Sequence, residues 1–408
     1  MMFFLGGCVK DNCTQTYTYF MPVYKTSSEV RANIKSNQPK EIERPGKLFI
    51  KGNYIFLNEV DRGIHILDNS NPSSPKNVAF IDIPGNMDLA VKGNILYADL
   101  YTDLLTLDIT NPLQVTIKSI IDNAFPFRNY LGFTGGFTAD RNKIIVDWVK
   151  RDTTVSIDCR NGGSAVWGCA NCMIFETSRS DAGAQKSSSP FGMGGSMARF
   201  TVVNSHLYTV SDNSLDVFSI SSPQTPVFTS KLQLGWGIET IYPFKNKLFI
   251  GSNTGMFIYD ISNPSQPSKQ GQFNHVRTCD PVIAEDKYAY VTLRTGTGCP
   301  GATNQLDVID ISDVFHPSLV KTYPMTNPHG LSKEGDILFI CEGKEGLKVY
   351  NAADPKSITL LKQVSGPDTY DVIAWNDLAI VSAADGLYQY DYSDVNNIRL
   401  LSKTVWKK

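Results

Sequence analysis

The stretch Gly63-Ile-His-Ile-Leu-Asp-Asn-Ser-Asn-Pro72 consists of a short apolar run, an aspartate and an Asn/Ser/Pro turn. Similar stretches recur at Leu104–Pro112, Gly255–Pro264 and Leu306–Asp313 of this 408-residue chain. The last polar residue of each run aligns at eight positions: Asp68, Asp108, Glu176, Ser219, Asp260, Asp310, Asn351 and Asp391. Five of the seven steps between them are 40 to 43 residues long. A fixed period of this length is typical of a repeat array.

Each unit contains the same order of strand and turn signals. An apolar segment leads to the turn Val91–Asn94, an alternating strand follows at Ile95–Asp99, and a fourth apolar segment runs over Val115–Ile121 after the Asp-containing strand. Short runs of Ile, Val, Leu, Phe and Tyr between turn residues indicate β-strands. The chain is therefore expected to be all-β, a β-propeller of four-stranded blades whose ring closure removes the sheet edges.

We count eight units, and a seven-bladed ring is the alternative. The third unit is the weakest, since only Lys143–Trp148 and Met173–Glu176 match the pattern, around a Gly/Ser-rich insertion at about 149–195. The propeller is expected over 46–408. Residues 9–45 are expected to form a tether with a short helix over Ser27–Ile34, in which Ser27 or Ser28 is the N-cap.

The recurring aspartate has a structural explanation. Asp, Asn and Ser side chains stabilise turns by accepting hydrogen bonds from nearby backbone N–H groups, and the proline that follows fixes φ. We therefore expect these positions to form turns rather than to bind a ligand. The formal net charge of −2 also argues against nucleic-acid binding, which requires a basic surface.

The N-terminus contains Leu5-Gly-Gly-Cys8, the pattern at which bacterial lipoproteins are cleaved and acylated on cysteine. The apolar region before it is too short for a working signal peptide, so residues 1–8 are interpreted as a truncated signal. The alternative is a chance Gly-Gly-Cys. A lipid on Cys8 would anchor the protein to a membrane without spanning it.

The other cysteines favour disulfides over metal. Cys279 and Cys299 flank the central segments of one unit and are expected to pair. Cys169 and Cys172 have a spacing found in zinc sites, but only Cys159 is nearby and no histidine lies between them. Cys341, within a predicted strand, is expected to be a buried free thiol.

Polar residues cluster where the first strand of several units begins. In a propeller this strand lines the central channel, so these side chains would lie near one channel mouth and could bind a cation, a sugar or a peptide end. The alternative is that they cap backbone groups and pair with neighbouring blades. Trp236 and Trp375 are expected to pack between blades, and the alternative is that they are exposed and form a binding platform. The mouth candidates are Asp88, Arg199, Glu239, Asp280, His329 and Asp371.

The chain resembles the LVIVD-repeat family, in particular the Bacteroidetes-type lipoproteins with this repeat. The resemblance covers roughly Tyr17 to Trp406. The segments that carry it, besides Gly63–Pro72, are Phe20–Tyr24, Ala79–Asn86, Gly194–Phe200 and Tyr388–Tyr392. It implies a propeller and a surface or periplasmic lipoprotein, and it implies no catalytic residues.

Two functional hypotheses follow. The first is a lipid-anchored propeller in the bacterial envelope, on the outer membrane, that binds or scaffolds another envelope protein. The second is an extracytoplasmic enzyme acting on glycans or a small substrate at the channel mouth, where two carboxylates would supply acid and base. No nucleophile, zinc-hydrolase or phosphate-loop motif occurs, which favours the first. No cofactor is expected, apart from a structural calcium ion that oxygen ligands in the channel could hold.

Overall fold

The structure is a computed structural model, and it describes residues 12–126, 140, 143–158, 173–174, 197–275, 281–295 and 303–407. The chain divides into two compact units. The first comprises residues 1–32 and 128–184, and the second comprises residues 33–127 and 185–408. No helix in the described ranges is long and apolar enough to cross a membrane.

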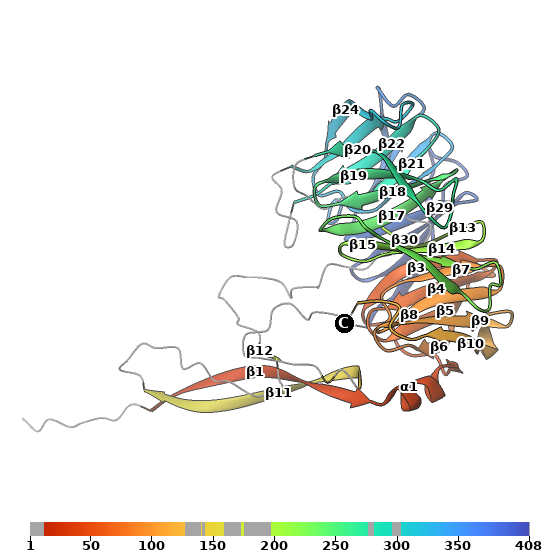
Figure 1. Cartoon of the computed structure of the whole chain (residues 1–408). Helices are drawn as coiled ribbons and strands as arrows, with labels where there is room; N and C mark the ends of the chain where they lie inside the picture. Colours follow the sequence, from red (N-terminus) through yellow and green to blue (C-terminus); the bar gives the residue numbers. More distant parts are fainter. Residues whose placement is uncertain are drawn as a thin grey trace, which may run out of the picture. The chain divides into compact units, whose positions relative to one another are not determined.

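The first unit contains a three-stranded antiparallel sheet. β1 (Asn12–Lys25) pairs with β11 (Ile144–Asp158) along its whole length, and β12 (Met173–Ile174) pairs with the other edge of β1 (Figure 1). Side chains link the two long strands, since the Thr18 hydroxyl donates to the Asp152 carboxylate at 2.6 Å. The predicted tether thus includes a 14-residue strand, which the sequence analysis did not identify.

A short helix follows β1. α1 spans Ser27–Asn33, close to the predicted range. Its N-cap is Thr26 rather than Ser27 or Ser28: the Glu29 N–H donates to the Thr26 hydroxyl at 3.2 Å, and the Thr26 N–H donates to the Glu29 carboxylate at 2.8 Å. This reciprocal pair is a capping box.

The second unit is a propeller of seven four-stranded antiparallel blades, each built from four consecutive strands (Figure 1). Blades 1 to 3 comprise β3 (Pro45–Lys51), β4 (Tyr54–Glu59), β5 (Gly63–Asp68) and β6 (Lys76–Asp82); β7 (Leu89–Lys92), β8 (Ile95–Leu100), β9 (Asp103–Asp108) and β10 (Thr116–Ile121); and β13 (Phe200–Val203), β14 (His206–Val210), β15 (Ser214–Ser219) and β16 (Val227–Gln233). Blades 4 and 5 comprise β17 (Ile238–Phe244), β18 (Lys247–Ser252), β19 (Gly255–Asp260) and β20 (Ser268–Asn274); and β21 (Val282–Ala284), β22 (Tyr288–Leu293), β23 (Gln305–Asp310) and β24 (Ser318–Pro324). Blades 6 and 7 comprise β25 (Leu331–Glu334), β26 (Ile337–Cys341), β27 (Leu347–Asn351) and β28 (Thr359–Val364); and β29 (Thr369–Trp375), β30 (Leu378–Ala383), β31 (Gly386–Asp391) and β32 (Arg399–Val405). Blade 1 has an additional outer strand, β2 (Ser36–Asn37), and the 3-10 helix η1 (Pro112–Gln114) precedes β10.

The count of eight units is wrong, and the seven-bladed alternative is confirmed. Ile144–Trp148 and Met173–Ile174, which were assigned to a third unit, lie in β11 and β12 and pair with β1. The error has a physical cause. Alternating apolar and polar residues indicate a strand but do not specify its partner.

The blades share one turn and one irregularity. In six of the seven blades, the residue that ends the third strand accepts a hydrogen bond from the backbone N–H two residues later, as at Asp108 (2.8 Å), Asp260 (2.8 Å) and Asn351 (3.0 Å). In blade 3 the equivalent residue is Ser219, whose hydroxyl lies 3.2 Å from that of Ser221. This confirms the structural explanation of the recurring aspartate. Each fourth strand then contains a register shift, a β-bulge, against the third. Bulges bend and twist a strand locally.

Apolar residues pack between neighbouring blades and between the last blade and the first. One cluster joins Leu48 and Leu57 of blade 1 with Ile373 and Ile380 of blade 7, and includes Trp406. The ring is closed by hydrogen bonds as well. The Lys407 N–H donates to the Ile42 carbonyl at 2.7 Å, and the Asn69 and Gln389 side-chain amides pair reciprocally at 2.9 and 2.7 Å.

Candidate functional site

The inner strands of neighbouring blades lie side by side around the ring axis, because the first strand of each blade is the innermost. Their starts meet at one face, which we call the start face. The second strand of every blade ends at this face too, since it is antiparallel to the first. The start face is therefore where the six mouth candidates were expected. Five of them, all except Asp280, lie in the described residues.

Asp88 is fully enclosed and paired. Its carboxylate forms an ion pair with Lys47 of blade 1, and both side chains are 1% exposed. The same carboxylate accepts from the backbone N–H groups of Arg199 (2.6 Å) and Phe200 (2.9 Å) in blade 3, and of Leu89 (2.7 Å). Asp88 therefore joins three blades.

Burial governs the electrostatics of this pair. Loss of hydration raises the pKa of Asp88, and the nearby Lys47 ammonium opposes that rise. Loss of hydration also lowers the pKa of Lys47 to about 8, in spite of Asp88. These shifts describe a structural ion pair enclosed between blades.

The segment before Asp88 is held by a buried carboxylate. Asp99 accepts from the backbone N–H groups of Met87 (2.8 Å) and Asp88 (2.9 Å), and from the side-chain amide of Asn86 (2.9 Å). Asn86 in turn accepts from the Asn58 amide of blade 1 at 2.6 Å. These buried hydrogen bonds fix the backbone that positions Asp88.

Arg199 differs from Asp88 because its side chain has no carboxylate partner within the described part of the chain. One Nη2–H donates to the Ile238 carbonyl of blade 4 at 3.1 Å, while Nε is buried without a hydrogen-bond partner. The guanidinium is also close enough to oppose protonation of Lys47. Among the described residues, the guanidinium therefore makes a hydrogen bond to backbone and no ion pair.

Glu239 and Arg294 lie next along the start face. Glu239 is the second residue of β17 in blade 4, and Arg294 follows β22 in blade 5. Burial lowers the pKa of Arg294, and the Glu239 carboxylate partly offsets this effect. Within the described ranges, the Arg294 guanidinium forms no hydrogen bond and no ion pair.

His329 lies between blades 5 and 7. Its carbonyl accepts from the Thr292 hydroxyl at 2.7 Å, and its ring centroid is 5.4 Å from that of Tyr370. The side chain is 9% exposed, and Nε2 is buried without a hydrogen-bond partner. Burial, with a smaller effect of Arg294, lowers the pKa of His329 to about 3. This imidazole is therefore neutral at physiological pH.

Asp371 completes the described set. It is 3% exposed, and its Oδ1 accepts from the Val372 N–H at 3.0 Å. A Cβ at Gly330 would lie 2.2 Å from that oxygen, so only glycine at 330 allows the approach. Asp280 and the disulfide candidates Cys159, Cys169, Cys172, Cys279 and Cys299 lie outside the described residues, as does Cys8. Cys341 is a buried free cysteine, as predicted.

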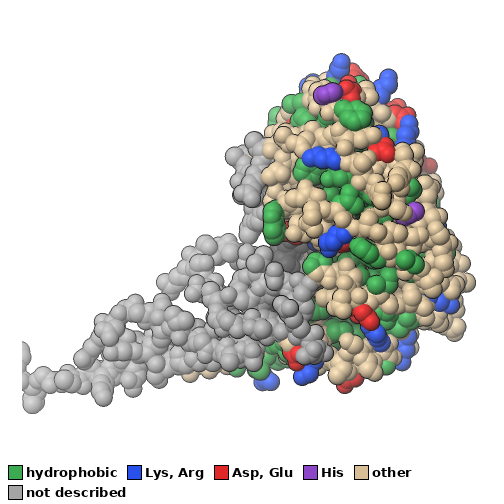
Figure 2. Space-filling view, in the orientation of Figure 1, with side chains coloured by type: hydrophobic (Ala, Val, Ile, Leu, Met, Phe, Trp, Pro, Cys, Tyr) green, Lys and Arg blue, Asp and Glu red, His purple; other side chains and the backbone are tan. Residues whose placement is uncertain are grey.

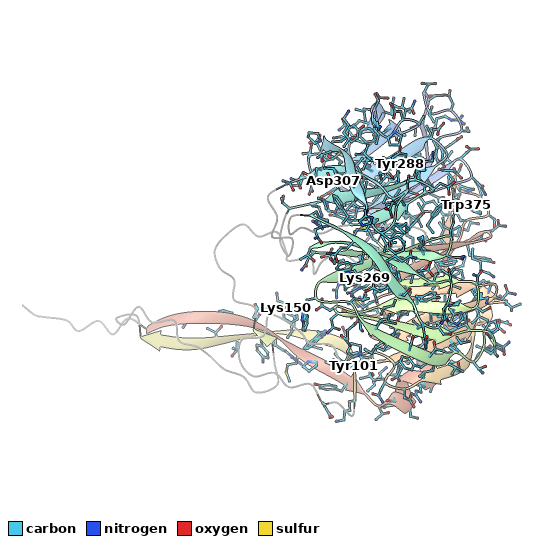
Figure 3. The ribbon with its side chains drawn as sticks, turned by 45° about the horizontal axis from the view of Figure 1, so that its top comes forward. Tyr101, Lys150, Lys269, Tyr288, Asp307 and Trp375 are labelled. Carbon is cyan, nitrogen blue, oxygen red and sulfur yellow. The ribbon has the colours of Figure 1, made fainter. Side chains whose placement is uncertain are left out.

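The prediction for the two tryptophans is wrong. Trp236 is 75% exposed, and Trp375, which is labelled in Figure 3, is 47% exposed. Gly235 (φ +109°) and Gly237 (φ +75°) flank Trp236 with backbone conformations that side chains rarely adopt, so the loop projects the indole. Trp375 lies at the hairpin between β29 and β30 instead.

Sequence reasoning missed Lys47, Arg294 and Tyr370. Lys47 occupies in blade 1 the position that Asp88 occupies in blade 2, since each precedes the first paired leucine of its inner strand. Extending the alignment to the first unit would have found it. Arg294 follows the end of a second strand, and Tyr370 lies at the start of a first strand. Both positions are on the start face, because second strands end where first strands begin.

The described residues contain no group of three or more His, Cys, Asp or Glu side chains placed to hold a metal ion. What the start face does offer is two guanidinium groups, Arg199 and Arg294, on either side of Glu239. Arginine provides planar, bidentate donors for carboxylate or phosphate oxygens.

Comparisons with known proteins agree with this architecture. The family model of the LVIVD repeat matches residues 46–81, 85–123, 246–275 and 278–325. These segments fall in blades 1, 2, 4 and 5. No curated protein matches the chain in sequence.

Similar solved structures share the fold at low sequence identity. Sqt1 from Saccharomyces cerevisiae is 8% identical with a TM-score of 0.51, covering 95% of this chain and 89% of that one. BamB from Moraxella catarrhalis is 7% identical with a TM-score of 0.51, covering 86% and 85%. A protein from Lactobacillus plantarum is 12% identical with a TM-score of 0.50, covering 96% and 97%. The chain therefore carries LVIVD repeats and folds as a seven-bladed β-propeller.

Proposed function

We propose that this propeller is a binding or scaffold module for another protein of the bacterial cell envelope, tethered to the outer membrane by a lipid on Cys8. The observation that carries the proposal is a set of exposed apolar side chains at one register position of the outer strands. This position is the residue of the fourth strand that pairs with the last but one residue of the third strand. It holds Ile117, Phe228, Leu319, Leu360 and Leu400 in five of the seven blades.

These side chains contact solvent in the isolated chain. Leu319, Leu360 and Leu400, in the consecutive blades 5, 6 and 7, are 50%, 52% and 53% exposed. Hydrophobic side chains are also visible among polar ones on the face of the propeller in Figure 2. Exposed apolar surface is a feature of protein–protein contacts, and its recurrence at one position of consecutive blades supports such a role here. Blade 4 has Lys269 at the same position, and blade 1 has Asn77.

The surroundings of Asp88 favour binding over glycan hydrolysis. A glycosidase needs two carboxylates that reach the substrate. Asp88 is enclosed, ion-paired with Lys47 and bonded to three backbone N–H groups. It is therefore a structural residue, and the proposal assigns binding to the outer strands instead.

The test is affinity purification of the tagged full-length protein from native membranes in detergent. Wild type is compared with the triple variant Leu319→Ser/Leu360→Ser/Leu400→Ser. We expect a stoichiometric protein partner with wild type and its loss with the triple variant. Recovery of no partner from wild type, or of the same partner from the triple variant, would contradict the proposal.

Two controls make the experiment specific. Lys269→Ser changes the same register position in blade 4 and should leave partner recovery unchanged. Cys8→Ala should move the protein from the membrane fraction to the soluble fraction, which tests the lipid anchor separately. Because the three leucines are half exposed, the triple variant should keep the thermal stability of wild type to within a few degrees.

A further inference from the structure

Two arginines on the start face, in blades 3 and 5, form no ion pair within the part of the chain that the structure describes. In most proteins a half-buried guanidinium is paired, because removing its hydration is costly. Arg199 donates only to one backbone carbonyl, and Arg294 forms no hydrogen bond within the described residues. Such an arrangement requires an explanation.

The two side chains belong to one continuous part of the start face. Arg199 reaches the Ile238 carbonyl of blade 4 at 3.1 Å, and Ile238 precedes Glu239 in β17. The Glu239 carboxylate is close enough to raise the pKa of Arg294 of blade 5, and Arg294 is close enough to lower the pKa of His329 at the start of blade 6. The series thus contains two guanidinium groups and the Glu239 carboxylate, beside the Lys47–Asp88 ion pair and Asp371 of the same face.

Buried nitrogen atoms in the same series also lack partners. Arg199 Nε and His329 Nε2 are both enclosed without a hydrogen-bond partner in the described structure. His329 is 9% exposed, so solvent does not satisfy its nitrogen. A buried guanidinium N–H without an acceptor, next to a second guanidinium and an unpartnered imidazole nitrogen, favours a ligand that supplies anionic oxygen atoms.

We propose that Arg199 and Arg294 form an anion-binding site that takes the carboxylate or phosphate group of a small ligand. This inference rests on the proposed role as a binding module, and it adds a second site on a different surface. Carboxylate and phosphate share the chemistry that a guanidinium recognises, two oxygens in one plane. The outer-strand surface and the start face can thus be tested independently.

The experiment is isothermal titration calorimetry of the purified full-length protein at pH 7 with succinate and with inorganic phosphate, at constant ionic strength set by chloride. We expect saturable binding of one probe. Preference for succinate would identify a carboxylate ligand, and preference for phosphate would identify a phosphorylated one. Absence of heat with both probes up to tens of millimolar would overturn the proposal.

Charge-removal variants locate the site. Arg199→Gln and Arg294→Gln should each weaken binding by about tenfold or more. The matched control is Arg399→Gln, which removes an arginine that is 62% exposed and paired with Asp391 on the outer strand of blade 7. Equal weakening by all three variants would indicate a nonspecific charge effect and overturn the proposal.

Folding and function can be separated in these variants. Arg294 forms no hydrogen bond within the described residues, so Arg294→Gln should keep the wild-type melting temperature while losing the rise that the bound anion gives wild type. If the anion binds but no protein partner co-purifies, the scaffold proposal fails and this site stands. If a partner co-purifies and no anion binds, the scaffold proposal stands and the anion site is overturned.

Discussion

At the scale of single residues, the repeat is held together by turn-forming carboxylates at the ends of third strands. Asp68, Asp260, Asp310 and Asp391 each accept the backbone N–H of the serine two residues later, at 2.8 to 3.0 Å. Asn351 does the same in blade 6 with an uncharged amide. The turn thus needs an acceptor oxygen, and the charge adds ion pairs to the fourth strand, as between Asp108 and Lys118 or Asp391 and Arg399.

Where the turn residue is an aspartate, the stability of the protein is expected to depend on pH in the acid range. Hydrogen bonds from Thr110 lower the pKa of Asp108 to about 2, and those from Ser393 lower that of Asp391 to about 2. Because folding lowers these pKa values from 3.8, their contribution is complete above about pH 4 and disappears as the pH falls toward 2. The melting temperature of Asp108→Asn/Asp391→Asn should therefore fall less between pH 4 and pH 2 than that of wild type.

Blade 6 already shows that an asparagine fits this turn, so the double variant should fold normally at pH 7. Differential scanning calorimetry across the pH range measures the effect. Parallel acid profiles for the two proteins would show that these carboxylates do not couple folding to pH.

These turns could be predicted from the chemistry of single residues, whereas the environment of the mouth candidates could not be predicted. The sequence placed Asp88 at the start of an inner strand, and its ion pair depends on Lys47, 41 positions earlier in the previous blade. The strand-start position of His329 was equally clear, but its burial comes from Tyr370 and Thr292 in other blades. Interactions across blades require the three-dimensional arrangement.

At the scale of elements, a glycine at the start of several third strands, or just before it, lies against the fourth strand. A Cβ at Gly63 would lie 2.0 Å from the Ile81 carbonyl oxygen, and one at Gly346 would lie 2.0 Å from that of Val364. Gly63 also has a φ of +146°. The close approach of the two backbones therefore depends on the missing side chain.

Gly63→Ala should destabilise the protein by more than about 2 kcal/mol, because the methyl group collides with backbone that cannot move without breaking the ladder. Gly93→Ala is the matched control. Gly93 has a φ of +56° but nothing within 4 Å of the added Cβ, so it should cost only about 1 kcal/mol. Urea unfolding of the two variants measures the difference, and equal losses would refute the steric explanation.

Strand existence was predictable from alternation, and strand pairing was predictable only inside a blade. Neighbouring strands of a blade are joined by short turns, so their partners follow from chain order. β1 and β11 pair from Asn12↔Asp158 to Lys25↔Ile144, across more than one hundred residues. Nothing in the local pattern of Ile144–Trp148 distinguishes a distant partner from an adjacent one.

At the scale of the whole molecule, the ring is closed by the last residues of the chain. The Trp406 Nε1–H donates to the Ala383 carbonyl at 2.7 Å, and the indole is 4% exposed among residues of blades 1 and 7. Ser402 Oγ donates to the Pro72 carbonyl at 2.6 Å. The last strand and the residue after it therefore join blade 7 to blade 1 through both apolar and polar contacts.

Trp406→Ala should lower the free energy of unfolding by about 3–5 kcal/mol, since it leaves a cavity at the closure and a carbonyl without its donor. Trp375→Ala is the matched control, because that indole is 47% exposed, and it should change the free energy by about 0.5 kcal/mol or less. Denaturation followed by circular dichroism compares the two variants. Similar losses would mean that the closure does not depend on Trp406.

The contact between blades 2 and 3 has a consequence for the evolution of the chain. Asp88 bonds the backbone of Arg199 and Phe200 directly, although the insertion separates β10 from β13 in sequence. Blade 1 and blade 7 are joined just as directly, through Ile42 and Lys407. The ring is therefore continuous in space both between blades 2 and 3, where the insertion lies in the sequence, and between blades 7 and 1. A gene encoding these blades could start at either junction and specify the same ring. The blades could therefore be circularly permuted along the chain while each blade kept the same neighbours in space.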